Sequence, residues 1–477
     1  MDFNLALKLD MPELILSISI LVILVFGAFR GDKGMTSVSA LSGAALIAAA
    51  FAAAFFTGYG TVFNGSFIVD QVALFAKVAI YAAGVLVIAL GQGYFDRVGS
   101  RRFEFPILVM LATLGMSMMV SAGDLISLYI GLEMQSLSLY VLAAFRRDDA
   151  KSSEAGLKYF VLGALSSGLL LYGASLVYGF AGSMNFHDIA ASAQGNLNVG
   201  LIFGLVFVIS GLAFKVSAAP FHMWTPDVYE GAPTPVVAFA AGAPKFAAMV
   251  LLARLLQTGF AHQIDQWRQV ILVLAVLSFL VGALGGLMQK DFKRLLAYSS
   301  IANMGYALLA IAAGTVVGVQ ALLMFFVMYM IDTLGLFSFS MALNRKGEPI
   351  SRIDQFAGLA KTNMPLTVCL TVLSLSVLGM PPFSGFWGKF FVFGAAISAG
   401  LWWVAALGLV ASVVGAFYYL RMIKLMWFDA PSGDIDPAPA EAKWVTYAAT
   451  AFSFPGVILF LILAYPVAKT AAAAFGH

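Results

Sequence analysis

Apolar segments of membrane-spanning length alternate with short polar segments along almost the whole chain. A helix that crosses a bilayer needs about 20 apolar residues, and about fourteen segments meet that requirement. The pattern therefore predicts an all-α polytopic membrane protein. The predicted spans lie near residues 12–30, 35–57, 71–92, 105–121, 123–145, 155–181, 199–229, 234–258, 269–289, 296–314, 317–342, 364–399, 401–427 and 444–467.

Two of these segments, 199–229 and 364–399, are too long for one straight helix. Each carries proline near its middle, Pro220 in the first and Pro381 with Pro382 in the second. Proline inside a helix removes a hydrogen bond and clashes with the preceding turn. Both segments are therefore predicted to be broken helices.

The two broken segments share a short motif, which indicates internal repeats. AAPFHMW at 218–224 and MPPFSGFW at 380–387 have a Pro-Phe core in common. Interrupted segments in corresponding positions are typical of transporters built from structural repeats. Repeats of five spans are inverted relative to each other, because five is an odd number of crossings. The expected division is N-terminal helices in 1–104, a first inverted repeat in 105–258, a second in 259–430 and a last helix in 431–477.

Basic residues gather in the loops that follow odd-numbered spans. Those loops carry most of the 27 Lys and Arg, and only the loop after the seventh span has none. Loops after even-numbered spans carry few. Because basic loops stay in the cytoplasm, this pattern predicts that both termini lie outside, on the opposite face of a membrane that the chain crosses many times.

Composition supports a membrane protein and limits the chemistry of the chain. It is 61% hydrophobic and 11% charged, with mean hydropathy +0.93, whereas a soluble domain is roughly 25% charged. The net charge of +3 gives no sign of nucleic-acid binding. The single cysteine, Cys369, excludes a disulfide framework and a four-cysteine iron–sulfur site within this chain. Without CxxC, HxxxH, GxGxxG or P-loop patterns, we expect no catalytic, cofactor or metal site here.

Five lysines lie inside the predicted spans: Lys77, Lys158, Lys215, Lys245 and Lys389. A charged amine near the centre of a bilayer costs at least ~2.5 kcal/mol, so a chain that keeps several is expected to use them. The last three lie beside prolines in broken or Pro-interrupted segments, where transporters place their ion sites. The pattern predicts a series of titratable groups through the membrane.

Glu133 lies deep in the span 123–145, and two interpretations of it remain open. It is either a neutral acid held by a hydrogen bond or a carboxylate that carries protons or pairs with a lysine. Desolvation favours the neutral form of a lysine, and a nearby carboxylate favours its charged form. Lys215 and Lys245 with a movable acidic partner would therefore exchange protons, and the alternative for each is a structural ion pair.

The other polar residues within the spans have weaker signals. Lys158 lies near the start of its span, where an amine can snorkel to the interface or pair with Glu154 at i,i+4. Lys77 is near the outer surface and is better explained as a snorkelling residue. Lys389 lies closer to the outer face than Lys215, which suits an exit site.

Two further residues have open roles. His222 lies beside the first break. It either links the two halves of the proton path or makes only structural hydrogen bonds. Asp332, deep in the span 317–342, has no assigned role.

Three long motifs carry a resemblance over essentially the whole chain: FKVSAAPFHMWTPDVYEGAPTPV, QKDFKRLLAYSSIANMGY and GMPPFSGFWGKFF. In this order they resemble the antiporter-like proton-translocating subunits of respiratory complex I, the bacterial NADH-quinone oxidoreductase. LYIGLEMQSLSLYVL and KYFVLGALSSGLLLYG are most similar to its N subunit, also called chain 2. Lysine rather than glutamate at 389 argues against the M subunit, and the absence of a long lateral helix argues against the L subunit.

The resemblance implies a role for each matching residue. Glu133 and Lys215 would pair in the first half-channel with Lys158 near them, Lys245 would be the central link, and Lys389 would serve the second half-channel. Where family members commonly have His in an SSIAHMGY-type motif, this chain has Asn303. Asn does not titrate, so the path there would run through water or hydrogen bonds.

The implied function is proton translocation coupled to quinone reduction in a neighbouring arm, with no redox centre in this chain. FMN, iron–sulfur clusters and quinone are expected in other subunits, K-like and M-like subunits as neighbours, and membrane lipids around the chain. A subunit of a multisubunit Na⁺/H⁺ antiporter, which shares the fold and buried lysines, is the alternative. A passive assembly scaffold is a third hypothesis.

Overall fold

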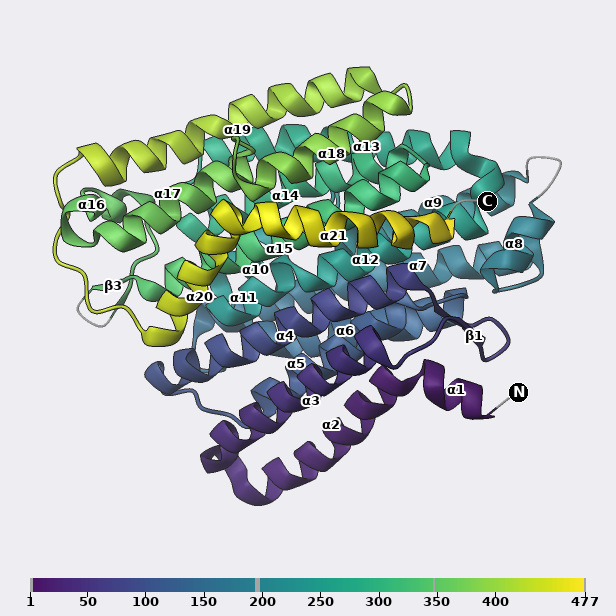
Figure 1. Cartoon of the computed structure of the whole chain (residues 1–477), viewed down its shortest axis with the longest axis horizontal. Helices are drawn as coiled ribbons and strands as arrows, with labels where there is room; N and C mark the ends of the chain where they lie inside the picture. Colours follow the sequence, from purple (N-terminus) through teal and green to yellow (C-terminus); the bar gives the residue numbers. More distant parts are fainter. Residues whose placement is uncertain (1–2, 194–197, 346–347, 476–477) are drawn as a thin grey trace.

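The computed structural model describes residues 3–193, 198–345 and 348–475, and most of them are helical. The helices lie side by side with roughly parallel axes (Figure 1). They are α1 Phe3–Leu9, α2 Met11–Arg30, α3 Met35–Phe55, α4 Gln71–Arg97, α5 Glu104–Val120, α6 Leu125–Ala143, α7 Ala150–Ala181, α8 Phe186–Ser192, α9 Val199–Lys215, α10 Trp224–Gly231, α11 Thr234–Ala241, α12 Ala243–Arg254, α13 Ile264–Leu287, α14 Phe292–Ala312, α15 Val316–Ala342, α16 Leu359–Thr362, α17 Met364–Leu378, α18 Ser384–Ser398, α19 Trp402–Phe428, α20 Ala440–Ala451 and α21 Val457–Ala472.

Strands are confined to two short antiparallel hairpins in the described ranges. β1 Gly60–Val62 pairs with β2 Phe67–Val69, and β3 Asn344–Arg345 pairs with β4 Glu348–Pro349. Ten helical segments of the described chain are long and apolar enough to cross a membrane, and Met11–Phe55 covers both α2 and α3. Shorter apolar helices are α5, α9 and α17. The predicted class, an all-α polytopic membrane protein, is confirmed.

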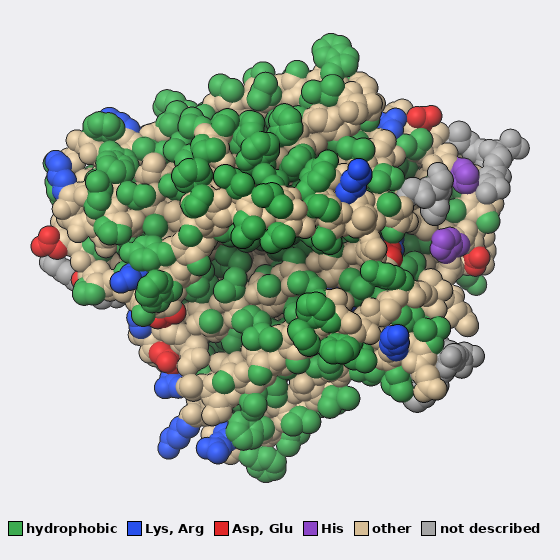
Figure 2. Space-filling view, in the orientation of Figure 1, with side chains coloured by type: hydrophobic (Ala, Val, Ile, Leu, Met, Phe, Trp, Pro, Cys, Tyr) green, Lys and Arg blue, Asp and Glu red, His purple; other side chains and the backbone are tan. Residues whose placement is uncertain are grey.

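Large apolar side chains cover the outside of the bundle, as Figure 2 shows for one face. Phe29, Leu165 and Val413 are 90%, 65% and 68% exposed. Charged side chains lie mostly at the two ends of the bundle in this view. An apolar belt of this extent is stable against lipid tails and not against water.

The helices break at both predicted prolines. α9 ends at Lys215 and α10 begins at Trp224, with Pro220 between them. α17 ends at Leu378 and α18 begins at Ser384, with Pro381 and Pro382 between them. At the first break the backbone N–H of Ala219 donates to Ser278 Oγ at 2.9 Å, so one of the freed backbone groups finds a side-chain partner.

Two further interruptions occur in the predicted spans 234–258, where the proline beside Lys245 already indicated one, and 444–467, where none was expected. Gly242 separates α11 from α12 with φ −109° and ψ −86°. In the last segment, the turn Phe452–Gly456 between α20 and α21 contains Pro455 next to the extended residue Phe454. At the first of these interruptions, Pro244 has no N–H with which to continue α11, and it suits a first helical turn. A new helix, α12, therefore starts beside it.

The centre of the bundle is formed by α11, α12, α14 and α15. The most apolar stretch of α11 and α12 is entirely buried inside the protein, and those of α14 and α15 are almost entirely buried. α15 packs against α11, α14, α18 and α20. Polar side chains on these helices therefore face protein and not lipid.

Candidate functional site

Lys215 is the last residue of α9 and points its amine at α6. It is buried, and its Nζ donates to Ser136 Oγ at 2.8 Å and to the Tyr140 hydroxyl at 2.9 Å. Glu133 lies one turn earlier on α6, where Ser167 of α7 donates a hydrogen bond to its carboxylate. Glu133 and Lys215 therefore do not form the expected ion pair in this structure, because neutral hydroxyls hold both the carboxylate and the amine.

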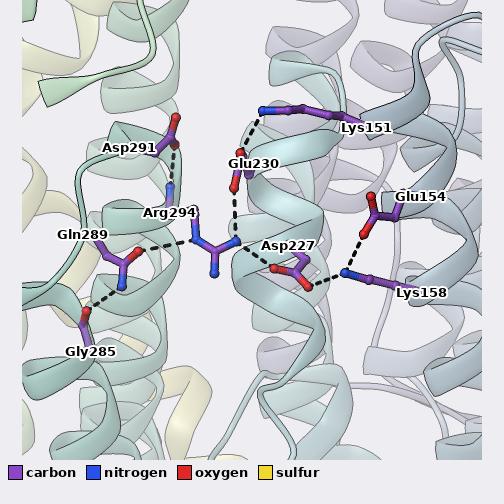
Figure 3. A network of polar contacts seen from close by, with 9 residues as sticks. All are labelled: Lys151, Glu154, Lys158, Asp227, Glu230, Gly285, Gln289, Asp291 and Arg294. Carbon is purple, nitrogen blue, oxygen red and sulfur yellow. Dashed lines mark hydrogen bonds and ion pairs between the residues drawn. The ribbon is translucent and has the colours of Figure 1, made fainter.

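Lys158 belongs to a network of ion pairs at the start of α7 (Figure 3). Its Nζ lies 2.7 Å from Asp227 Oδ2 and 2.7 Å from Glu154 Oε1. The i,i+4 partner Glu154 is thus confirmed, and the side chain of Lys158 is 41% exposed. Asp227, on α10, is a partner that the sequence analysis did not single out.

Arg294 of α14 extends the same network toward α10. Its Nη1 lies 2.7 Å from Asp227 Oδ1 and 3.1 Å from Glu230 Oε2, and Lys151 Nζ lies 2.9 Å from Glu230 Oε1. These charged residues line a cavity of about 150 Å³. The sequence signals for this network were the i,i+4 pair of Glu154 and Lys158 and the two carboxylates three residues apart on α10, whose partners come from distant helices.

Lys245 lies on α12, in the first turn after the break at Gly242. It is fully buried, and its Nζ donates to Ser300 Oγ on α14 at 2.8 Å. The Tyr329 hydroxyl of α15 donates to the same Ser300 oxygen at 2.7 Å, and the ring of Tyr229 lies 5.3 Å from the amine. Ser300 therefore joins the lysine to α15 through hydroxyl groups alone.

Lys389 lies on α18, in the second turn after the second break. Its Nζ donates to the carbonyl oxygen of Leu378, the last residue of α17, at 2.9 Å and to Ser412 Oγ at 3.2 Å. The ring of Tyr306 lies 4.7 Å from the amine. A carbonyl freed by the helix break thus holds this lysine.

Two small cavities lie between Lys245 and Lys389. One is lined by Ser299, Ser300 and Tyr329, among others, and the second by Asn303, Tyr329, Asp332 and Lys389 with apolar neighbours. Each measures about 10 Å³, about the minimum for one water molecule. Tyr329 borders both cavities, so hydroxyls and space for water connect the two lysines.

His222 lies between α9 and α10 and is partly exposed. Its buried Nδ1 has no hydrogen-bond partner among the described residues. Among the described residues, no hydrogen bond or ion pair joins it to Lys215 or Lys245, so the structure does not bring it into their contacts.

Lys77 corrects the expectation of a snorkelling residue. It is fully buried in α4, and its Nζ lies 2.6 Å from Glu13 Oε1 of α2 and 4.7 Å from the ring centroid of Phe67. Ser117 of α5 also donates to Glu13, and the Tyr81 hydroxyl lies 2.6 Å from Ser117 Oγ. The lysine stays inside because a carboxylate from a helix far away in the sequence faces it.

The broken helices and their buried lysines define a polytopic membrane protein of the antiporter type. Residues 122–415 match the family described as NADH:quinone oxidoreductase/Mrp antiporter, TM. The chain is 62% identical over 386 residues to NADH-quinone oxidoreductase subunit N of Caulobacter sp. (strain K31), covering 80% of each chain. It is 53% identical over 441 residues to the protein of that name from Maricaulis maris, covering 92% of each.

A solved structure agrees with these relatives. A chain of respiratory complex I from Thermus thermophilus with bound aureothin has 33% identity and a TM-score of 0.83, with 96% of this chain and 100% of that chain covered. The chain therefore belongs to the subunit N family of NADH-quinone oxidoreductase, the membrane-arm subunits of complex I. The expected membership in the antiporter-like subunits is confirmed, and the names of the relatives favour complex I over the Na⁺/H⁺ antiporter alternative.

Proposed function

We propose that the chain carries protons across the bilayer through a relay of Glu133, Lys158, Lys215, His222, Lys245 and Lys389, driven by quinone reduction elsewhere in complex I. One observation carries this proposal. Within the described residues, the amines of Lys215, Lys245 and Lys389 form no ion pair with a carboxylate. A buried amine without a carboxylate partner has no opposite charge to hold it in the charged form, so it can lose and regain a proton, as a carrier requires.

The proposed path begins at the 150 Å³ cavity beside Lys158. From there the proton reaches Lys215 and passes to Lys245. Ser300, Tyr329 and the two water-sized cavities then lead to Lys389. Hydroxyls serve the step from Lys245 toward Lys389, because they both donate and accept hydrogen bonds.

The proposed control lies in the contact between α6 and α9. Glu133 is held by Ser167 while Lys215 is held by Ser136 and Tyr140. Movement of the carboxylate toward Lys215 stabilises the charged amine, and the return movement releases its proton onward. Quinone reduction in a neighbouring arm would drive this alternation, with FMN, iron–sulfur clusters and quinone held by other subunits.

We further propose fourteen crossings of the bacterial inner membrane, arranged as two inverted five-span repeats in 105–258 and 259–430 that follow the N-terminal helices of 1–104 and precede the last helix of 431–477. Support comes from the chain ends, which lie at the same end of the bundle, opposite to β3 (Figure 1). A chain that crosses a membrane an even number of times has both ends on the same side. In this orientation the basic loops are cytoplasmic and both termini are periplasmic. We expect K-like and M-like subunits as the neighbours of the chain in the complex.

Lys245 offers a direct test of the relay. Lys245→Met removes the titratable amine and keeps most of the side chain, so the complex should assemble while proton translocation falls roughly tenfold or more, as for loss of a positioned proton-transfer group. Lys361→Met removes an exposed amine and should leave translocation unchanged. The measurement is proton uptake by membrane vesicles, normalised to assembled complex, and normal uptake in Lys245→Met would refute the relay.

A further inference from the structure

Asp332 is a carboxyl group in the middle of α15 that is only 1% exposed. Ser376 Oγ, near the end of α17, donates to its Oδ2 at 2.6 Å. Ser384 Oγ, at the start of α18, lies 3.0 and 3.1 Å from the two carboxyl oxygens and 3.0 Å from Ser453 Oγ. A cluster of serine hydroxyls thus surrounds one carboxyl beside the second helix break.

The contacts of Asp332 suit two protonation states. Its hydrogen bonds within the described ranges come from serine hydroxyls, and no ion pair reaches it. A carboxylate without a cation is costly in a membrane interior, which favours the neutral acid at rest. Serine hydroxyls accept from a neutral acid and donate to a carboxylate. The same hydroxyls therefore stabilise Asp332 before and after it releases a proton.

Asp332 also shares a cavity with the last lysine of the proposed relay. Asp332, Lys389, Asn303 and Tyr329 line the same space of about 10 Å³, about the minimum for one water molecule. Asn303 has no titratable proton, and its amide donates to the carbonyl of Ser299 at 2.9 Å. Asp332 is the only carboxyl group that lines this cavity in the described part of the chain.

We infer that Asp332 is a proton carrier of the second half of the path and delivers its proton to Lys389. This inference rests on the relay proposed above. The O–H bond of the neutral acid breaks and an N–H bond forms on the neutral amine, directly or across one water molecule. The products are a carboxylate and an ammonium group that face each other across the cavity. The next proton, arriving from Lys245 by way of Ser300 and Tyr329, restores the acid.

The test compares Asp332→Asn with the same variant that also carries Asn303→His. Asparagine keeps the size of the side chain and its ability to hydrogen-bond the serines, but it has no proton to transfer. Asp332→Asn should assemble normally and translocate protons several-fold more slowly. Adding Asn303→His places a titratable group at the same cavity and should restore more than half of the lost rate.

Each remaining outcome contradicts the inference. Near-normal translocation by Asp332→Asn excludes a carrier, and a defect that Asn303→His does not relieve assigns Asp332 a structural role. Lys389→Met, measured in parallel, distinguishes a failure of the proposed role of Asp332 from a failure of the relay. If Lys389→Met is defective while Asp332→Asn is normal, the relay stands and only the role of Asp332 fails, whereas normal rates in both contradict the relay itself.

A second readout does not depend on pumping. The infrared spectrum of the intact complex should contain a carbonyl stretching band of a protonated carboxylic acid that Asp332→Asn removes. The matched comparison is Asp354→Asn, which changes an exposed carboxylate ion-paired with Arg352 and should not remove that band. An unchanged band in Asp332→Asn would show that the group is ionised at rest and contradict the inference.

Discussion

At the scale of residues, the five lysines of the predicted spans fall into two groups according to their partners. Lys77 and Lys158 face carboxylates at 2.6 and 2.7 Å, whereas Lys215, Lys245 and Lys389 face hydroxyls and a backbone carbonyl. An amine paired with a carboxylate has a fixed charge, and an amine bonded only to neutral groups exchanges its proton more easily. This difference separates the proposed carriers Lys215, Lys245 and Lys389 from the structural Lys77, while Lys158 lies at the cavity where the proposed path begins.

Lys77→Met should act on stability and not on pumping. The change leaves Glu13 buried without its cation, which costs about 3–5 kcal/mol when one partner of a buried pair is removed. We expect less assembled complex and a lower unfolding temperature, with normal translocation per assembled complex. The double variant Glu13→Gln with Lys77→Met should recover stability, because replacing both partners leaves no unpaired charge. A pumping defect in the double variant would instead place this pair in the proton path.

The sequence alone predicted that Lys215, Lys245 and Lys389 are buried, but it did not predict the hydroxyls and the carbonyl that hold them, and it wrongly placed Lys77 at the interface. Apolar runs around Lys245 and Lys389 require burial, whatever the packing. Their partners Ser300 and Ser412 come from other helices, and so does Glu13 for Lys77. Such contacts depend on the packing of helices that are distant in sequence, and a local pattern carries no information about them.

At the scale of elements, the helix breaks position the lysines. Lys215 ends the helix before the first break, Lys245 follows the break at Gly242, and Lys389 follows the second break. Each break frees backbone groups that helices normally satisfy internally, and at the second break Lys389 uses one of them. The two breaks within long segments were predictable from length and proline. The segment of Lys245 was already recognised as interrupted by proline, whereas the break at Pro455 was missed because its apolar run has an ordinary length.

Gly379→Ala should disturb the second break. Gly379 has φ +95°, and an added Cβ would lie 2.9 Å from Lys389 Cδ. A left-handed conformation costs a non-glycine residue roughly 1–2 kcal/mol, and the methyl group pushes the lysine from its carbonyl partner. We expect assembled complex with several-fold slower translocation. Gly394→Ala on α18 meets no atom within 4 Å and is the control, expected to pump normally; equal rates in both variants would contradict this role of the break.

At the scale of the whole molecule, the apolar belt and the polar ends fix how the bundle sits in a membrane. Large apolar side chains face outward over the middle of the bundle, and charges gather at its ends (Figure 2). The predicted all-α polytopic class followed directly from segment length and hydropathy. The number of crossings and the inverted repeats remain predictions, because the packing of the helices does not itself define which of them cross the bilayer.

The orientation is tested by reporters of compartment. A reporter fused to the C-terminus should be active only in the periplasm, and one inserted beside Arg345 should be active only in the cytoplasm, because basic loops are retained there. Alkaline phosphatase and a fluorescent protein give opposite signals at each position. The reverse pattern would overturn the assignment of sides, and the same side for both positions would overturn the count of crossings.

The central claim is that buried lysines work by gaining and losing a proton, and Lys389 tests it most directly. Lys389→Arg keeps the positive charge, but arginine is effectively never deprotonated, while Lys389→Met keeps approximate length without charge. The measurement is proton translocation in membrane vesicles, normalised to assembled complex. The relay predicts that both variants assemble and pump poorly. Near-normal pumping by Lys389→Arg beside a defective Lys389→Met would mean that the lysine supplies only a fixed charge, and would contradict the account.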